Sequence, residues 1–274
     1  MKKLSRTLLS FFCALSMLAV FSAPNACAQR SEMGQRESVS PEIFTPLEPK
    51  DPLTRARAHT ELAALYFQDG ELIIALEELT LAIAFNPEYA TAYSMRALAL
   101  FYLKEFPSAA KDFQKSIELD PRDPDISNNY GWYLCQTGKE KDALSYFKNA
   151  FDNVLYKTPE VAYLNAGMCL AKQGELDSAE EFVNRSLVLA PNNPRAFFQL
   201  AIISYKRENF DAARDYLNRV QRQVNETEAD VLWLALRVER RLGNDMGEAS
   251  LAAQLKRRFP DSPEYRDFLK GNFE

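Results

Sequence analysis

Residues 127–138, SNNYGWYLCQTG, decide the fold because they carry the marks of a closely packed helix pair. Gly131 lies inside a helical run, where the missing side chain lets a second helix approach. Gly138 follows that run, at a turn where a left-handed backbone conformation favours glycine. About one repeat length before and after Gly131, another small residue stands in the same kind of surroundings. The stretch therefore predicts a helix–turn–helix unit that recurs along the chain.

A register laid out from this stretch divides most of the chain into six units, whose starts are spaced by 34, 34, 36, 34 and 34 residues. The units start at Ala56, Ala90, Pro124, Glu160, Pro194 and Glu228. The eighth position of each unit is small, as a close contact between its two helices requires. These small residues are Ala63, Ala97, Gly131, Gly167, Ala201 and Ala235. A 34-residue period of paired helices is typical of tetratricopeptide repeats.

The periodicity predicts an all-α protein, in which residues 53–274 form a right-handed superhelix of six tetratricopeptide helix-turn-helix repeats. Two places depart from the period. Two residues are inserted after Phe151, and the last unit is irregular around residues 243–247. An atypical terminal repeat is expected, because it covers the end of the stack.

Residues 1–28 have the pattern of a secretory signal peptide. Basic residues precede an apolar run from Leu8 to Phe21, which is too short to span a bilayer comfortably. Two interpretations of its processing remain open. Cleavage after Ala28 would release a soluble periplasmic protein, whereas lipidation of Cys27 would anchor the protein to a membrane face.

Residues 29–52 are polar, contain four prolines and show no helical period. This composition predicts a flexible, proline-rich tether between the signal and the repeats. A plain disordered N-terminus would have the same composition.

The composition excludes several classes of function. The net charge of −5 leaves no basic footprint for nucleic acid, and only 9 glycines argue against phosphate-binding loops. His59 is the only histidine, and it falls on a position that packing usually occupies. No nucleophile motif, carboxylate pair or metal-ligand spacing stands out. We therefore expect a protein that is not an enzyme and that has no cofactor or metal.

The first helices of the units carry the candidate binding surface. In tetratricopeptide repeats, five positions of the first helix face the concave surface, and here most of them hold aromatic or aliphatic residues. Such a strip predicts a site for an amphipathic segment of a partner protein. The partner-binding candidates are Phe67, Leu98, Phe101, Tyr102, Asn128, Trp132 and Met168. The alternative is that neighbouring helices bury some of them.

Several polar residues fall on the same predicted surface. Asn128 and its neighbour Asn129 would either bond to the backbone of a partner or tie their helix to the preceding loop. Lys172 and Lys206 take the thirteenth position of the fourth and fifth units.

Cys135 and Cys169 stand on the first helices of adjacent units, which should be neighbours in space. An exported location permits a disulfide between them. Two buried free thiols are the alternative.

Three strings lie at positions that the generic repeat leaves free: SNNYGWYLCQTG at 127–138, YKTPEVAYLNAGMCLAKQG at 156–174 and RRFPDSPEYRDFLKGNF at 257–273. With them the chain resembles the PilF/PilW family of type IV pilus biogenesis proteins, over essentially all of its exported length.

The resemblance implies a six-repeat lipoprotein on the periplasmic face of the outer membrane, acting as a pilotin. A pilotin helps the secretin, the ring-shaped outer-membrane pore, reach its membrane and multimerise there. The implied partners are the secretin subunit and, through Cys27, the outer membrane. Pro24 departs from the usual residue three places before a lipidated cysteine, which leaves a soluble periplasmic protein as the other localisation. A periplasmic adaptor for a different envelope assembly complex is the alternative function.

Overall fold

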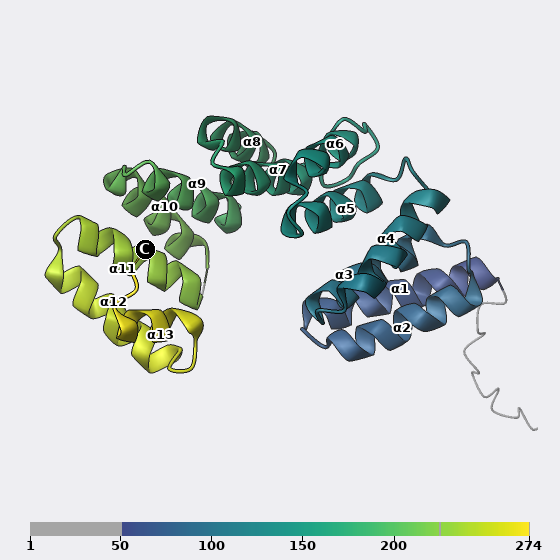
Figure 1. Ribbon diagram of the computed structural model, residues 1–274, viewed down its shortest axis with the longest axis horizontal. Coiled ribbons are helices and arrows are strands. Elements are labelled where there is room, and N and C mark those ends of the chain that lie inside the picture. The colour runs from purple at the N-terminus through teal and green to yellow at the C-terminus, as the bar shows by residue number, and fades with distance from the viewer. Residues whose placement is uncertain (1–50, 225, 274) are drawn as a thin grey trace, which may run out of the picture. The chain divides into compact units, whose positions relative to one another are not determined.

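The computed structural model describes residues 51–224 and 226–273, which fold into helices joined by turns (Figure 1). The first helices of successive pairs are α1 (Pro52–Gln68), α3 (Ala90–Tyr102), α5 (Pro124–Gln136), α7 (Pro159–Gln173), α9 (Pro194–Lys206) and α11 (Ala229–Arg241). The second helices are α2 (Leu72–Phe85), α4 (Phe106–Leu119), α6 (Glu140–Phe151), α8 (Leu176–Leu189), α10 (Phe210–Gln223) and α12 (Asp245–Arg258), and α13 (Pro263–Lys270) follows. The predicted signal peptide, with Cys27, and nearly all of the predicted tether lie outside the described residues.

The helices pack in the pattern of a repeat array. Each helix contacts the one that follows it in the chain, and each first helix also contacts the first helix of the next pair. The all-α prediction is confirmed, and the six helix pairs follow the predicted register. We number these pairs as the first to the sixth repeat.

The small residues of the register lie where two helices of one repeat come closest. A Cβ atom built on Gly131 would lie 2.9 Å from the Phe147 ring, and one on Gly167 would lie 2.6 Å from Val183 Cγ2. Ala63, Ala97 and Ala201 fill the same position elsewhere and are fully buried. A close approach of two helices therefore recurs at the eighth position, as the register predicts.

Helix α1 begins before the first predicted unit and takes one residue of the predicted tether. The Asp51 side chain accepts a hydrogen bond of 2.8 Å from the Thr54 backbone N–H, and Pro52 occupies the first turn. This pair is a strong helix start. The aspartate side chain accepts a hydrogen bond from a free backbone N–H group, and the proline ring fixes its own φ near the helical value. This cap adds a turn ahead of Ala56.

Helix α13 closes the C-terminal end of the array. Its Phe268 joins a cluster of Leu232, Leu236 and Leu255 from α11 and α12. Phe273, just after α13, stacks on the Trp233 ring at 5.5 Å between centroids. The tail string singled out in the sequence thus covers apolar surface that a seventh repeat would otherwise cover.

Candidate functional site

An aromatic cluster lies where the first three repeats meet. The Phe67 ring of α1 lies 5.5 Å from the Tyr102 ring of α3, and Phe101 lies 5.6 Å from Tyr102. Phe101 also contacts Phe106 of α4 at 5.6 Å and Tyr133 of α5 at 5.9 Å. Tyr102 is 50% exposed and Phe106 is also exposed. We call these five residues the aromatic cluster. It joins three of the predicted binding residues to two, Phe106 and Tyr133, that the sequence analysis did not select.

Leu98 and Trp132 are half-buried, on α3 and α5. Trp132 packs against a buried cluster that includes Leu134, Cys135 and Phe147. Both alternatives for the strip therefore apply in part, because Trp132 packs on the core while Leu98 and Trp132 both stay partly accessible.

Asn128 is a correction to the predicted set. It is only 6% exposed, and its side-chain oxygen accepts a hydrogen bond of 2.9 Å from Asn165 Nδ2 of α7. The neighbouring Asn129 donates to Ser94 Oγ of α3 at 3.2 Å. The two asparagines bind α5 to the repeats on both sides, since a buried amide is stable only when it is hydrogen-bonded. Asn128 is thus an inter-repeat link, and it ties α5 to the next repeat rather than to a loop.

The two lysines on the predicted surface also form hydrogen bonds between repeats. Lys172 Nζ donates to the Cys135 carbonyl oxygen at 2.7 Å, and Lys206 Nζ donates to the Ala171 carbonyl oxygen at 2.8 Å. Each lysine reaches back to the first helix of the preceding repeat. The last carbonyls of a helix lack helical partners and carry partial negative charge, so a cation there is favourable.

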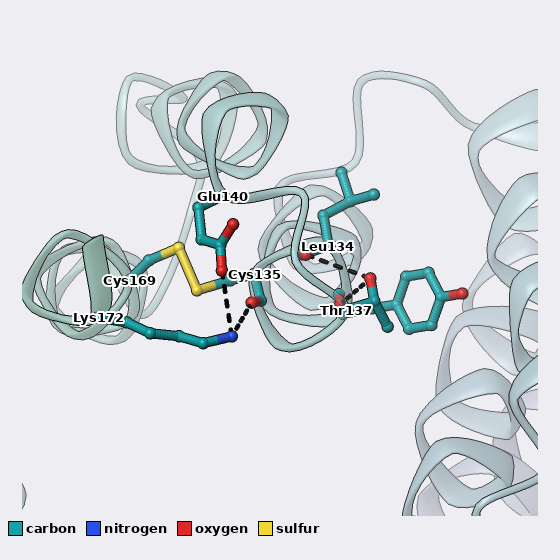
Figure 2. Close-up of a disulfide and its surroundings, with 7 residues drawn as sticks. Leu134, Cys135, Thr137, Glu140, Cys169 and Lys172 are labelled. Atoms are coloured by element: carbon teal, nitrogen blue, oxygen red, sulfur yellow. Dashed lines mark hydrogen bonds and ion pairs between the residues drawn. A yellow bond between two sulfur atoms is a disulfide. The ribbon is translucent and has the colours of Figure 1, made fainter.

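Cys135 and Cys169 form a disulfide between α5 and α7 (Figure 2). Their Cα atoms lie 5.8 Å apart and both residues are buried. Figure 2 shows Lys172 reaching from α7 alongside this bond toward Glu140, at 3.2 Å, and the Cys135 carbonyl. A backbone hydrogen bond and then the one from Lys172 lower the pKa of Glu140. Of the two alternatives for the cysteines, the structure has the bonded one.

Met168 lies apart from the aromatic cluster, on the wall of a cavity of about 480 Å³. Phe198, Gln199 and Ile202 of α9 line the same cavity, together with Asp230 at the start of α11. Burial raises the pKa of Asp230, and the nearby Glu228 and Glu264 carboxylates add to that rise. Gln199 and Asp230 are not among the sequence-predicted binding residues, because the cavity is lined by segments that come together only when three repeats pack.

Across residues 51–224 and 226–273, no three His, Cys, Asp or Glu side chains are grouped so as to hold a metal ion. No helix in that part of the chain combines the length and apolar character needed to cross a membrane. His59 lies 2.6 Å from Glu78 and stacks on Phe85, so it is held by packing and one polar contact.

Comparison with known protein families identifies the class of protein. Family models described as tetratricopeptide repeat match residues 90–123, 113–145, 138–194 and 195–224. The helix pairs, the close contacts at the eighth position and these matches define a tetratricopeptide repeat protein. Such arrays are protein-interaction modules with extended binding surfaces.

Individual relatives identify the family to which the chain belongs. The crystal structure of PilW, a widely conserved type IV pilus biogenesis factor, is 32% identical with a TM-score of 0.70, and the match covers 78% of this chain and 98% of PilW. The structure of Pseudomonas aeruginosa PilF is 26% identical, with a TM-score of 0.65, over 81% of this chain and 100% of PilF. The type IV pilus assembly protein PilF of that organism is 27% identical over 211 residues, which is 77% of this chain and 83% of the relative. The chain belongs to the PilF/PilW family of type IV pilus biogenesis proteins.

Proposed function

We propose that the protein is a pilotin of the type IV pilus machinery, a scaffold that binds secretin subunits and promotes their localisation and multimerisation in the outer membrane. Family membership supports the pilus role. The observation that carries the binding role is the aromatic cluster, in which Phe67, Phe101 and Tyr102 come together from two successive repeats.

The cluster suits an apolar or amphipathic partner segment. Aromatic rings offer a large contact area with few rotatable bonds, so they bind at low entropic cost, and Tyr is enriched among binding hot spots. The Tyr102 ring meets the edges of Phe67 and Phe101 and is half exposed. An apolar side chain of the secretin would cover these rings. In this mechanism the scaffold makes no covalent bond, and binding holds subunits together until they assemble.

The protein would act at the periplasmic face of the outer membrane if Cys27 is lipidated, and in the soluble periplasm if cleavage follows Ala28. The mass of the mature N-terminus distinguishes an acylated Cys27 from a chain that begins at Gln29.

The proposal is tested with one charge placed at two equally exposed positions. Tyr102→Glu lies in the aromatic cluster, and Leu189→Glu, at the end of α8, is the control; the two native side chains are 50% and 51% exposed. We expect Tyr102→Glu to weaken secretin binding by about 2 kcal/mol, or roughly thirtyfold, as loss of a hot spot does. Cells with this variant should lose secretin multimers on a gel and lose pili, while Leu189→Glu supports both.

Circular dichroism should give both variants the helix content of the native protein. Normal multimers in a strain that lacks the protein would refute the pilotin role. In that case, capture of a different envelope complex would favour the adaptor alternative. Equal effects of the two variants would refute the aromatic cluster as the binding site.

A further inference from the structure

A cavity of about 480 Å³ opens between the fourth, fifth and sixth repeats, and it contains none of the aromatic cluster. Its apolar wall consists of Met168 from α7 and Phe198 and Ile202 from α9, all of which are half-buried. A volume of this order accommodates one large side chain with its flanking backbone. Met is an adaptable wall residue, because its flexible thioether fits different apolar shapes.

Gln199 is a buried polar group that lines this cavity. It is 6% exposed, and no residue in the described part of the chain hydrogen-bonds with its side-chain amide. The amide is not among the fully buried unpaired side-chain atoms of the described residues, so it reaches the cavity, where a bound segment can replace water as its partner. A glutamine amide offers one acceptor and two donor hydrogens, which complement a backbone peptide group. An extended segment has such peptide groups free, whereas a helix uses its own.

The rim of the cavity is acidic. Glu226, Glu228 and Asp230 line it, and Arg195 is the only base among the lining residues. None of the three carboxylates forms an ion pair with any residue that the structure describes. The nearby Arg258 guanidinium instead donates to the Thr227 carbonyl at 2.9 Å. Among the described residues, the rim therefore holds three carboxylates without an ion pair, and burial and like charges raise the pKa of Asp230 there.

We propose that this cavity is a docking site for an extended segment of a partner protein that carries a large apolar side chain flanked by lysine or arginine. The apolar side chain packs on Met168, Phe198 and Ile202, and a peptide group of the segment pairs with Gln199. The flanking cation lies at the Glu228 and Asp230 carboxylates. The charge of the rim and the unpaired amide select this occupant over a purely apolar one. The site stands independently of the aromatic cluster, and it holds whether or not the partner is a secretin.

The proposal is tested by titrating the protein, purified after export, with three capped heptapeptides. Their sequences are GSKFKSG, GSEFESG and GSKAKSG. NMR signals of the Met168 and Ile202 methyl groups report occupation of the cavity. We expect saturable shifts with the Lys-Phe-Lys peptide. The Glu-Phe-Glu and Lys-Ala-Lys peptides should each bind about tenfold more weakly or worse, because one lacks the charge and the other the apolar group. Added salt should weaken the first interaction.

Two variants and two controls connect binding to the named residues. The double variant Glu228→Gln, Asp230→Asn keeps shape and removes charge, and it should reduce Lys-Phe-Lys binding by about tenfold. Gln199→Met should reduce it by about fivefold without lowering the melting temperature, because the amide has no partner to lose in the free protein. The exposed Glu88→Gln, between α2 and α3, should change nothing. Tyr102→Glu should also leave this binding intact, which separates the docking site from the proposed pilotin function.

The proposal is overturned if the methyl signals do not move at about 2 mM peptide, a concentration that detects even millimolar affinity. Equal binding of the three peptides would overturn it as well. A lower melting temperature of Gln199→Met would show that the amide has a partner within the free chain. Methyl shifts that depend on protein concentration alone would show that a second copy of the chain fills the cavity. Either result refutes a docking site for this segment.

Discussion

Helix α5 takes part in two junctions that are built from different interactions. Toward the second repeat α5 has ring contacts and a single hydrogen bond of 3.2 Å among the described residues, from Asn129 to Ser94 Oγ. Tyr133 lies 4.8 Å from the Phe113 ring and 5.9 Å from the Phe101 ring. Toward the fourth repeat α5 has the disulfide of Cys135 and the hydrogen bond of Asn128. The junction with the second repeat is therefore formed largely by aromatic rings, whereas the junction with the fourth repeat contains a disulfide and a hydrogen bond to the buried Asn128.

The two junctions suit different roles: the aromatic one can bind a partner, and the disulfide-bonded one holds two repeats rigidly together. Ring contacts tolerate small shifts and leave edges and faces accessible, as the exposed Tyr102 and Phe106 show. A disulfide and hydrogen bonds are directional, so they fix the register of α5 against α7. The proposed secretin-binding surface thus lies at the adjustable junction, beside one that is held firmly.

Loss of the disulfide should have the largest effect. Closing a loop of sequence separation 34 is expected to stabilise the native chain by about 3–4 kcal/mol, mainly by restricting the unfolded state. The Cys135→Ala, Cys169→Ala double variant should lose about this much in urea unfolding. Hydrogen exchange should accelerate most in α5 and α7. Reductant should have a similar effect on the native chain and none on the variant. Equal acceleration in α1 and α3 would contradict the firm junction.

Replacing Gly131 or Gly167 with alanine should destabilise the chain by different amounts, although both glycines occupy the eighth position of a repeat. Overpacking costs about 1–3 kcal/mol, and replacing glycine with alanine in a helix returns about 1 kcal/mol. In Gly167→Ala the new Cβ would meet Val183 Cγ2 at 2.6 Å and the Ala179 carbonyl oxygen at 3.0 Å. In Gly131→Ala it would meet the buried Phe147 ring at 2.9 Å and the Ala143 carbonyl oxygen at 3.2 Å, and both contacts are longer than the matching ones at Gly167.

We therefore expect Gly167→Ala to destabilise the chain by about 1–2 kcal/mol in urea unfolding, and Gly131→Ala by less than about 1 kcal/mol. Ala201→Gly is the reverse control, and it should cost about 1 kcal/mol from helix propensity and about 1 kcal/mol more from the buried methyl group that is lost. A larger loss in Gly131→Ala than in Gly167→Ala would show that the third repeat is the more tightly packed one.

The asparagine pair compares the two junctions at adjacent residues. Asn128→Ala removes the acceptor of Asn165 and leaves a half-buried donor unpaired, at a cost of about 1–2 kcal/mol. Asn129→Ala removes the longer bond to Ser94 and should cost about 0.5–1 kcal/mol. A double-mutant cycle of Asn128→Ala with Asn165→Ala measures the coupling directly. A coupling near zero would mean that this bond does not stabilise the junction.

The lysines should give the smallest effect. Lys172→Met and Lys206→Met keep the aliphatic stem and remove the charge from the end of the preceding helix, at a cost of about 0.5 kcal/mol each. Lys172→Met should cost slightly more, because Lys172 also lies 3.2 Å from Glu140. Urea unfolding at low and high salt should show that both effects shrink as salt rises. Effects that do not change with salt would refute the electrostatic explanation.

The fold could be predicted because its signals are local and repeated. The small residue at the eighth position, as at Gly131 and Gly167, reflects a backbone contact that tolerates almost no side chain. Such a contact repeats with the period of the chain. The first-turn cap at Asp51 is also local, but it falls before the first full unit, so the period did not include it.

The candidate site could be predicted only in part, because a register fixes where a residue stands and leaves open what its side chain contacts. Phe67, Phe101 and Tyr102 meet as the register suggests. Asn128 and Lys172 stand on the same predicted surface, yet their side chains turn toward polar groups of a neighbouring repeat, Asn128 toward the following one and Lys172 toward the preceding one. The cavity around Met168 depends on the loop before α11, whose path no periodic signal describes.

The disulfide also divides the array. Repeat arrays open from their ends, because a terminal repeat has only one neighbour to hold it. The bond joins the third repeat to the fourth, so the α1 and α3 rings of the aromatic cluster lie on its N-terminal side and the α9 and α11 residues of the cavity lie on its C-terminal side. Fraying that starts at either end would stop at this bond. Each of the two proposed binding surfaces would therefore loosen on its own side of the bond while the other keeps its shape.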